Sequence, residues 1–210
     1  MKRTYLWGEF VLLFWGLPVF LALYPLPIPK VLLLLPVAGL CLVSLLRDRS
    51  FDRTQLWNAA AAREGLPRVL LLFALTAPIL AAGVLLFLPS AFLGLARRAP
   101  FLWGAIMLLY PLLSVYPQEL IYRAFLFQRY RPLLGGDAAL TGWSAAAFGF
   151  VHILYGSFVS VLLSLAGGYL FATSYRRSRS LLLAAVQHAL YGDLIFTLGL
   201  GQFFYRPPTP

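Results

Sequence analysis

The stretch YPQELIYRAFLFQRY, residues 116–130, places a glutamate and an arginine four residues apart in an otherwise apolar run. Residues at positions i and i+4 share one face of a helix, so Glu119 and Arg123 can form an ion pair on a single helix. The whole chain is 61% hydrophobic and 11% charged, whereas soluble domains are about half apolar and about a quarter charged. The sequence therefore predicts a polytopic membrane protein that buries charges inside a membrane helix.

Apolar runs that could cross a membrane recur along the chain, since a spanning helix needs about 20 mostly apolar residues. The fourth run is too long for one straight span, and Pro111 and Pro117 each remove a backbone donor, so we expect a kink or a break there. The predicted fold is an all-α transmembrane helix bundle of seven to eight membrane segments, forming one membrane domain over residues 1–210. The runs lie at residues 5–24, 30–46, 67–89, 101–130, 138–155, 157–175 and 181–200.

The longest polar segment, RDRSFDRTQLWNAAAAREG at residues 47–65, separates the second run from the third. It is basic and rich in alanine, which is typical of a helix that lies in the membrane interface. Gly65 and Pro67 follow as helix-ending residues. The segment is therefore predicted to form a short interfacial helix that ends at these two positions.

Lysine and arginine outnumber aspartate and glutamate by 17 to 7. The basic residues cluster between apolar runs, which is the pattern of membrane anchoring, and no basic stripe is interleaved with aromatics on a polar face. We therefore expect membrane lipid, and not nucleic acid, as a partner. With seven spans the positive-inside rule favours an inner N-terminus and an outer C-terminus; an eighth span would weaken this bias. The expected location is the bacterial cytoplasmic membrane.

Several ionisable side chains lie within the predicted spans: Glu119, Arg123, His152, His188 and Asp193. Each such group in hydrocarbon costs at least about 2.5–3.5 kcal/mol on insertion scales. Taken singly, the charged pair can be a structural bridge, a histidine can bond a neighbouring helix, and the aspartate can cap or break the last helix. Because they occur together on successive segments, we expect the first four to converge on one polar cavity. Carboxylate, arginine and two histidines are a set that can activate and hold a water molecule.

These residues resemble the CPBP intramembrane proteases, also called the CAAX protease and bacteriocin-processing (Abi) family. That family carries the motifs Glu-Glu-x-x-x-Arg, Phe-x-x-x-His and His-x-x-x-Asn, each on a membrane helix. Here the first motif reads QELIYR and matches at Glu119 and Arg123. The second reads FGFVH and matches at Phe148 and His152, and the third reads HALYG and matches at His188.

The resemblance covers residues 100–200 and departs from the family pattern at two positions. Gln118 stands where the family has its first glutamate, which is thought to activate water together with the histidine of the second motif. Gly192 stands where the family has asparagine. Asp193 follows and is a candidate substitute, although neighbouring helix positions point about 100° apart. With Phe148, which is expected to pack, Asp193 is therefore assigned a supporting role.

The resemblance implies an intramembrane endopeptidase that cleaves a membrane-tethered protein or peptide with an activated water. In this hypothesis Glu119 and His152 activate the water, and His188 stabilises the oxyanion. Arg123 and Gln118 then support the reaction by holding the carboxylate and by donating a hydrogen bond. The alternative is a catalytically inactive homologue that acts as a membrane-embedded binding or immunity protein, which the glutamine favours. A small transporter or proton relay ranks last, because the chain has no internal repeat.

A metal site is a further question raised by the same residues. Two histidines and one carboxylate resemble the three protein ligands of a catalytic zinc ion. No His-Glu-x-x-His pair lies on one helix, and the family has been described both as metal-dependent and as glutamate-dependent. We therefore favour a site without metal or other cofactor, and leave zinc dependence open.

Overall fold

The structure is a computed structural model that describes residues 3–24 and 26–205; residues 1–2, 25 and 206–210 of the expected domain lie outside the described residues. All regular secondary structure within the described residues is helical. Short 3-10 and π-helical turns, labelled η, interrupt or follow the α-helices. The α-helices are α1 (Arg3–Val11), α2 (Leu17–Leu23), α3 (Lys30–Arg47), α4 (Ala59–Phe87), α5 (Gly94–Arg98), α6 (Pro100–Tyr110), α7 (Tyr116–Glu119), α8 (Leu126–Arg129), α9 (Arg131–Leu134), α10 (Asp137–Val151), α11 (Phe158–Ser178) and α12 (Leu181–Leu198). The other turns are η1 (Leu12–Gly16), η2 (Arg53–Trp57), η3 (Pro89–Ala91), η4 (Pro111–Val115), η5 (Leu120–Phe125), η6 (His152–Tyr155) and η7 (Leu200–Phe204).

Seven helical segments of the described chain are long and apolar enough to cross a membrane, which confirms the predicted transmembrane bundle. The first segment joins α1, η1 and α2, and the fourth joins α6 through α8. The protein is therefore an integral membrane protein. The segments are Arg3–Leu23, Lys30–Arg47, Ala59–Phe87, Pro100–Arg129, Asp137–Tyr155, Phe158–Ser178 and Leu181–Leu198.

The fourth segment, Pro100–Arg129, is one continuous helical stretch and not two spans. The π-helical turn η4 begins at Pro111, and a second, η5, follows Glu119. A π-turn shifts the backbone pairing by one residue, so the helix can continue where a proline lacks its amide hydrogen. The expected break is therefore absent from this segment, and π-turns take its place.

The segment at residues 47–65 differs from the predicted interfacial helix. It forms the short 3-10 turn η2, and α4 then runs without interruption through Gly65 and Pro67. The prediction that these two residues end a helix is wrong. A Cβ atom at Gly65 would lie 2.4 Å from Leu183 Cδ2, so α4 packs tightly against α12 here. Tertiary packing of this kind overrides the weak local preference of a glycine.

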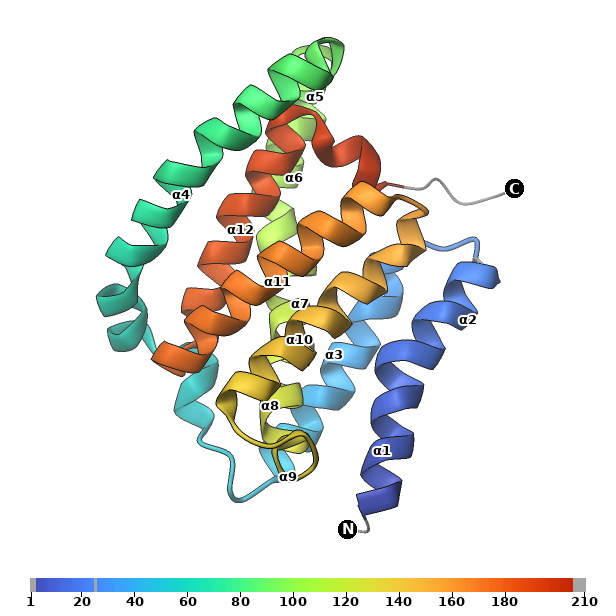
Figure 1. Ribbon diagram of the computed structural model, residues 1–210, viewed down its shortest axis with the longest axis vertical. Helices are drawn as coiled ribbons and strands as arrows, with labels where there is room; N and C mark the ends of the chain where they lie inside the picture. Colours follow the sequence, from blue (N-terminus) through green and yellow to red (C-terminus); the bar gives the residue numbers. More distant parts are fainter. Residues whose placement is uncertain (1–2, 25, 206–210) are drawn as a thin grey trace.

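Figure 1 shows α10, α11 and α12 side by side across the middle of the bundle, with α1–α3 on one flank and α4 on the other. Small residues allow α10 and α11 to approach closely: a Cβ atom at Gly149 would lie 3.0 Å from Leu165 Cα, and one at Gly168 would lie 3.2 Å from Ala145 Cα. Such close backbone approach is how membrane helices gain packing energy without a hydrophobic driving force. The close packing of α10 against α11 therefore holds the C-terminal end of α10 in place.

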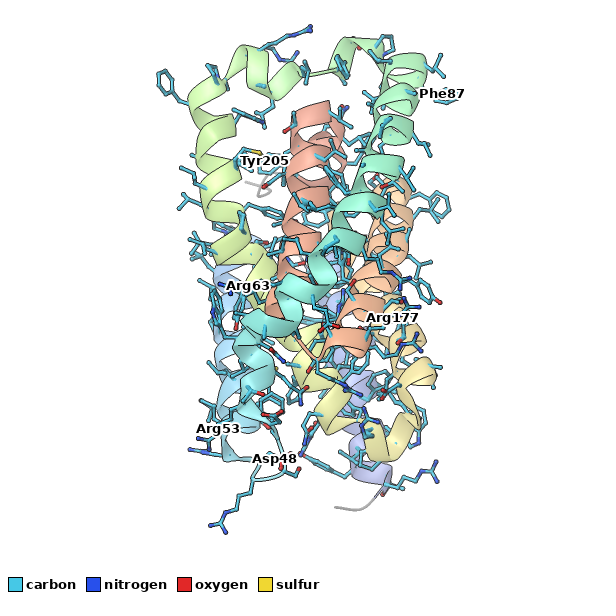
Figure 2. All side chains as sticks on the ribbon, turned by 90° about the vertical axis from the view of Figure 1, so that its left-hand side faces the viewer. Asp48, Arg53, Arg63, Phe87, Arg177 and Tyr205 are labelled. Carbon is cyan, nitrogen blue, oxygen red and sulfur yellow. The ribbon has the colours of Figure 1, made fainter. Side chains whose placement is uncertain are left out.

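The two ends of the bundle carry different residues. Figure 2 shows Asp48 and Arg53 at one end and Phe87 at the other. The beginning of α1 and the turn η7 also lie at opposite ends, as an odd number of crossings requires (Figure 1). The assignment of the Asp48 end to the inner side of the membrane stays a prediction from the charge bias.

An ion pair fastens the first segment to the fourth. Arg129 Nε and Nη2 donate to the two carboxylate oxygens of Glu9 at 2.9 and 2.8 Å, and the Tyr130 hydroxyl donates to Oε1 at 2.8 Å. Bidentate arginine–carboxylate contacts of this kind are directional as well as attractive. The carboxylate of Glu9 is therefore satisfied by partners within the protein.

Candidate active site

The first motif forms an ion pair that is wholly buried. Arg123 Nε lies 2.9 Å from Glu119 Oε2, and neither side chain is exposed. A second guanidinium nitrogen, Nη1, donates to Ser144 Oγ at 2.8 Å, and the guanidinium lies 4.8 Å from the centre of the Phe148 ring. The predicted pairing of Glu119 with Arg123 is confirmed, and α10 supplies both Ser144 and Phe148 as further contacts of the arginine.

The second partner of the Glu119 carboxylate is His188 on α12, 69 residues along the chain. His188 Nδ1 lies 2.9 Å from Glu119 Oε1. A carboxylate that is already paired with arginine accepts hydrogen bonds, so the imidazole proton lies on Nδ1. The Phe171 ring stacks on His188 with centroids 4.6 Å apart. The orientation of His188 is therefore fixed by Glu119 on its edge and by Phe171 on its face.

His152 directly follows the last residue of α10 and is the first residue of the 3-10 turn η6. Its Nδ1 lies 2.7 Å from the carbonyl oxygen of Phe148, which can only accept, so Nδ1 carries the proton. Nε2 of the neutral ring is then a free acceptor. The ring packs edge-on against Phe148 at 4.9 Å and lies 5.7 Å from the Phe204 ring of η7. The backbone bond to Phe148 therefore selects the tautomer in which Nε2 can take a proton.

His152 and His188 line one cavity of about 360 Å³ between α4, the fourth segment and α10–α12. Most of its wall is apolar. Glu119 and Arg123 do not line the cavity. Glu119 is bonded to His188, which does. The predicted convergence on one polar cavity therefore holds for the two histidines only, and not for the charged pair. The remaining lining residues are Thr76, Ile79, Leu80, Tyr110, Ser114, Gln118, Phe148, Tyr155, Leu163, Ser164, Ala166, Gly167, Leu170, Phe171, Tyr191, Gly192, Ile195, Phe196 and Phe204.

The two positions that depart from the family motifs both face this cavity. Gln118 lines it and donates through Nε2 to Ser114 Oγ at 2.7 Å. Gly192 lines it as well, whereas Asp193 does not. Asp193 Oδ1 is buried and has no hydrogen-bond partner among the described residues. The aspartate is therefore not placed to supply the side chain that is missing at position 192.

The arrangement does not match a three-ligand zinc site. Both oxygens of Glu119 face Arg123 and His188, and Nδ1 of each histidine is engaged in a hydrogen bond. Within residues 3–24 and 26–205, no group of three or more His, Cys, Asp or Glu side chains could hold a metal ion. The Glu119 carboxylate and His188 are therefore hydrogen-bond partners of one another, and His152 is bonded to the Phe148 carbonyl oxygen.

Three contacts of the site were not anticipated from the sequence: those of Tyr110, Ser144 and Phe171. Tyr110 OH lies 3.1 Å from His188 Nε2, and it comes from the apolar run before Pro111. A tyrosine at membrane depth needs a partner for its hydroxyl, which is the signal that could have singled it out. Serine and phenylalanine are common in membrane helices and carry no such signal.

One comparison with known proteins finds a family model that is similar to part of the chain. The model described as type II CAAX prenyl endopeptidase Rce1-like matches residues 100–192, which is slightly under half of the chain. No curated protein and no solved structure matches the chain. The matched region contains all three motifs and most of the groups that line the cavity. The match confirms the resemblance given by the motifs: residues 100–192 are similar to the type II CAAX prenyl endopeptidase family.

Proposed function

We propose that this protein is an intramembrane endopeptidase that hydrolyses a peptide bond of a membrane-tethered protein or peptide. The observation that carries the proposal is the presence of His152 and His188 on the wall of one largely apolar cavity among membrane-spanning helices. The match to a protease family supports hydrolysis as the class of reaction. We also propose that the protein lies in the cytoplasmic membrane of a bacterium, with the Asp48 end of the bundle on the inner side as the charge bias favours.

His152 is the proposed base, because its Nε2 is an acceptor and its ring lines the cavity. It takes a proton from a water molecule, the water oxygen bonds to the peptide carbonyl carbon, and the carbon–nitrogen bond breaks. The imidazolium then returns the proton to the departing amine. One amide hydrogen of Gln118 is not used by Ser114, and it is the proposed donor to the carbonyl oxygen as negative charge develops there.

Glu119 has a different proposed role from the one that the motif suggests. Because its carboxylate is bound by Arg123 and His188 and lies off the cavity wall, it is a positioning residue for the His188 imidazole. The rigid His188 ring in turn shapes the wall against which the peptide lies. Removal of Glu119 is therefore expected to act through His188.

The test is a peptidase assay on protein in lipid vesicles, with a library of lipid-tethered peptides. Wild type should cleave at least one peptide, and His152→Ala should lose at least about a hundredfold in kcat, the usual contribution of a positioned base. Leu162→Ala is the control, because Leu162 is exposed on α11. Equal cleavage by wild type and His152→Ala would refute the assignment of the base.

A non-catalytic binding protein is the second candidate, and one observation favours it. The described residues that line the cavity include no carboxylate, and an amide, Gln118, stands where the family has its first glutamate. An amide cannot accept a proton from water at neutral pH. Under this candidate the cavity binds the tethered peptide and releases it uncut, so binding without any product would decide in its favour.

A further inference from the structure

Gly192 and Tyr110 fit together in a way that the motifs do not reveal. A Cβ atom at position 192 would lie 2.3 Å from Tyr110 Cε1 and 2.5 Å from its hydroxyl oxygen. Any other residue at this position would therefore collide with the tyrosine, because real contacts do not come so close. Gly192, which replaces the asparagine of the third motif, thus lets the Tyr110 ring pack against α12 because it has no side chain.

The same tyrosine ends a chain of hydrogen bonds that begins at the buried carboxylate. Glu119 accepts from His188 Nδ1, and His188 Nε2 lies 3.1 Å from Tyr110 OH. With the imidazole proton on Nδ1, the Nε2 atom of neutral His188 can only accept, so the Tyr110 hydroxyl donates to it. The lone pairs of the phenol oxygen are left for another partner. Since Tyr110 lines the cavity, that partner can be a ligand in the cavity.

We propose that Tyr110 is a catalytic residue whose hydroxyl oxygen accepts a hydrogen bond from the reacting water, in a place that Gly192 keeps open. This inference rests on the proposed peptidase function. The water donates one hydrogen to His152 Nε2 and the other to the Tyr110 oxygen, so that its own lone pair is directed at the peptide carbonyl. Glu119 and His188 serve to hold the phenol, and cooperative polarisation along the chain strengthens the acceptor. No proton leaves Tyr110 in this step.

Two variants remove the acceptor by different routes. Tyr110→Phe deletes the hydroxyl and keeps the ring. Gly192→Ala keeps the hydroxyl and displaces the ring, because the new methyl group would occupy its place. Gly104→Ala is the matched control: it lies on α6, the helix of Tyr110, and a Cβ atom there would meet nothing within 4 Å.

The first measurement is independent of activity. Nitrogen-15 NMR of histidine-labelled protein in nanodiscs should show the His188 Nε2 resonance shifted in both Tyr110→Phe and Gly192→Ala. The His152 Nδ1 resonance, which reports the bond to the Phe148 carbonyl oxygen, should stay in place, and Gly104→Ala should match wild type. An unchanged His188 Nε2 resonance in Tyr110→Phe would overturn the proposal, because the hydroxyl would then not be held by the imidazole.

The second measurement is steady-state cleavage of a lipid-tethered peptide in the same nanodiscs. Tyr110→Phe and Gly192→Ala should each lower kcat about threefold to tenfold, the usual worth of one hydrogen bond, with KM unchanged. Equal kcat in wild type and Tyr110→Phe would overturn the proposal while leaving the peptidase function intact. Absence of turnover in wild type would instead overturn the peptidase function, and with it the role of Tyr110 toward water, whatever the NMR result.

Discussion

Glu119 and His188 are joined by a hydrogen bond of 2.9 Å between Oε1 and Nδ1, although 69 residues separate them in the chain. The bond connects the fourth membrane segment to the last one. It also turns the one carboxylate of the first motif away from the cavity and toward an imidazole. That orientation, together with the ion pairs around it, determines how the protein should respond to substitution.

Glu119→Gln should reduce both stability and turnover. The neutral amide leaves the fully buried Arg123 without an anion, which costs about 3–5 kcal/mol for a broken buried pair. It also weakens the hold on His188, so kcat should fall at least about tenfold in protein that is still folded. Circular dichroism melting and cleavage measured well below the melting temperature separate the two effects. Glu64→Gln is the control, since Glu64 is exposed; wild-type turnover in Glu119→Gln would contradict the positioning role.

Arg123→Ala should destabilise the protein by about 3–5 kcal/mol, because it leaves the Glu119 carboxylate unpaired and removes a bond to Ser144. Arg177→Ala, at an exposed position of α11, should change stability by no more than about 0.5 kcal/mol. Chemical denaturation in detergent measures both. The double variant Glu119→Gln/Arg123→Met should recover part of the loss, since neither charge is then left alone. Similar stability of Arg123→Ala and Arg177→Ala would argue against the pairing.

Gln118→Glu should lower kcat at least about tenfold, because a carboxylate replaces the proposed donor and repels the developing oxyanion. Two adjacent carboxylates at positions 118 and 119 would also disfavour their charged forms. Gln118→Met, which removes the amide without adding charge, should lose less. The vesicle assay compares the three proteins. If only Gln118→Glu cleaves, the natural protein is a non-catalytic homologue and the second candidate function is correct.

Glu9→Gln should loosen the first membrane segment. The change removes the charge that Arg129 and Tyr130 bind, at a site that is partly open to its surroundings, so a loss of about 1–2 kcal/mol is expected. Limited proteolysis and thermal melting in detergent can follow it, with Glu64→Gln as the matched control. Identical proteolysis of the two variants would show that the pair does not hold this segment.

The local features of the site could be predicted from the sequence, because they depend on helix geometry alone. The spacing of Glu119 and Arg123 placed both on one helix face, and the cost of burying them required an interior location. The direction in which the carboxylate points could not be predicted, since it depends on the packing of α12 against the fourth segment. Helix continuity at Gly65 and at Pro111 was missed for a related reason: neighbouring helices and π-turns compensate for what each residue lacks locally.

Part of the cavity wall is α4, which contributes Thr76, Ile79 and Leu80 from the middle of a membrane-spanning helix. The lipid-tethered peptide proposed as substrate is dissolved in the bilayer and not in the surrounding water. The concentration that determines how much of it binds is then its mole fraction among the lipids. Each added lipid lowers this mole fraction, although the volume of the sample hardly changes. Lipids also compete with it as solvent for the apolar surface. The affinity of such a peptide for this protein must consequently be expressed per lipid. Adding lipid to fixed amounts of protein and peptide will make the measured binding appear weaker.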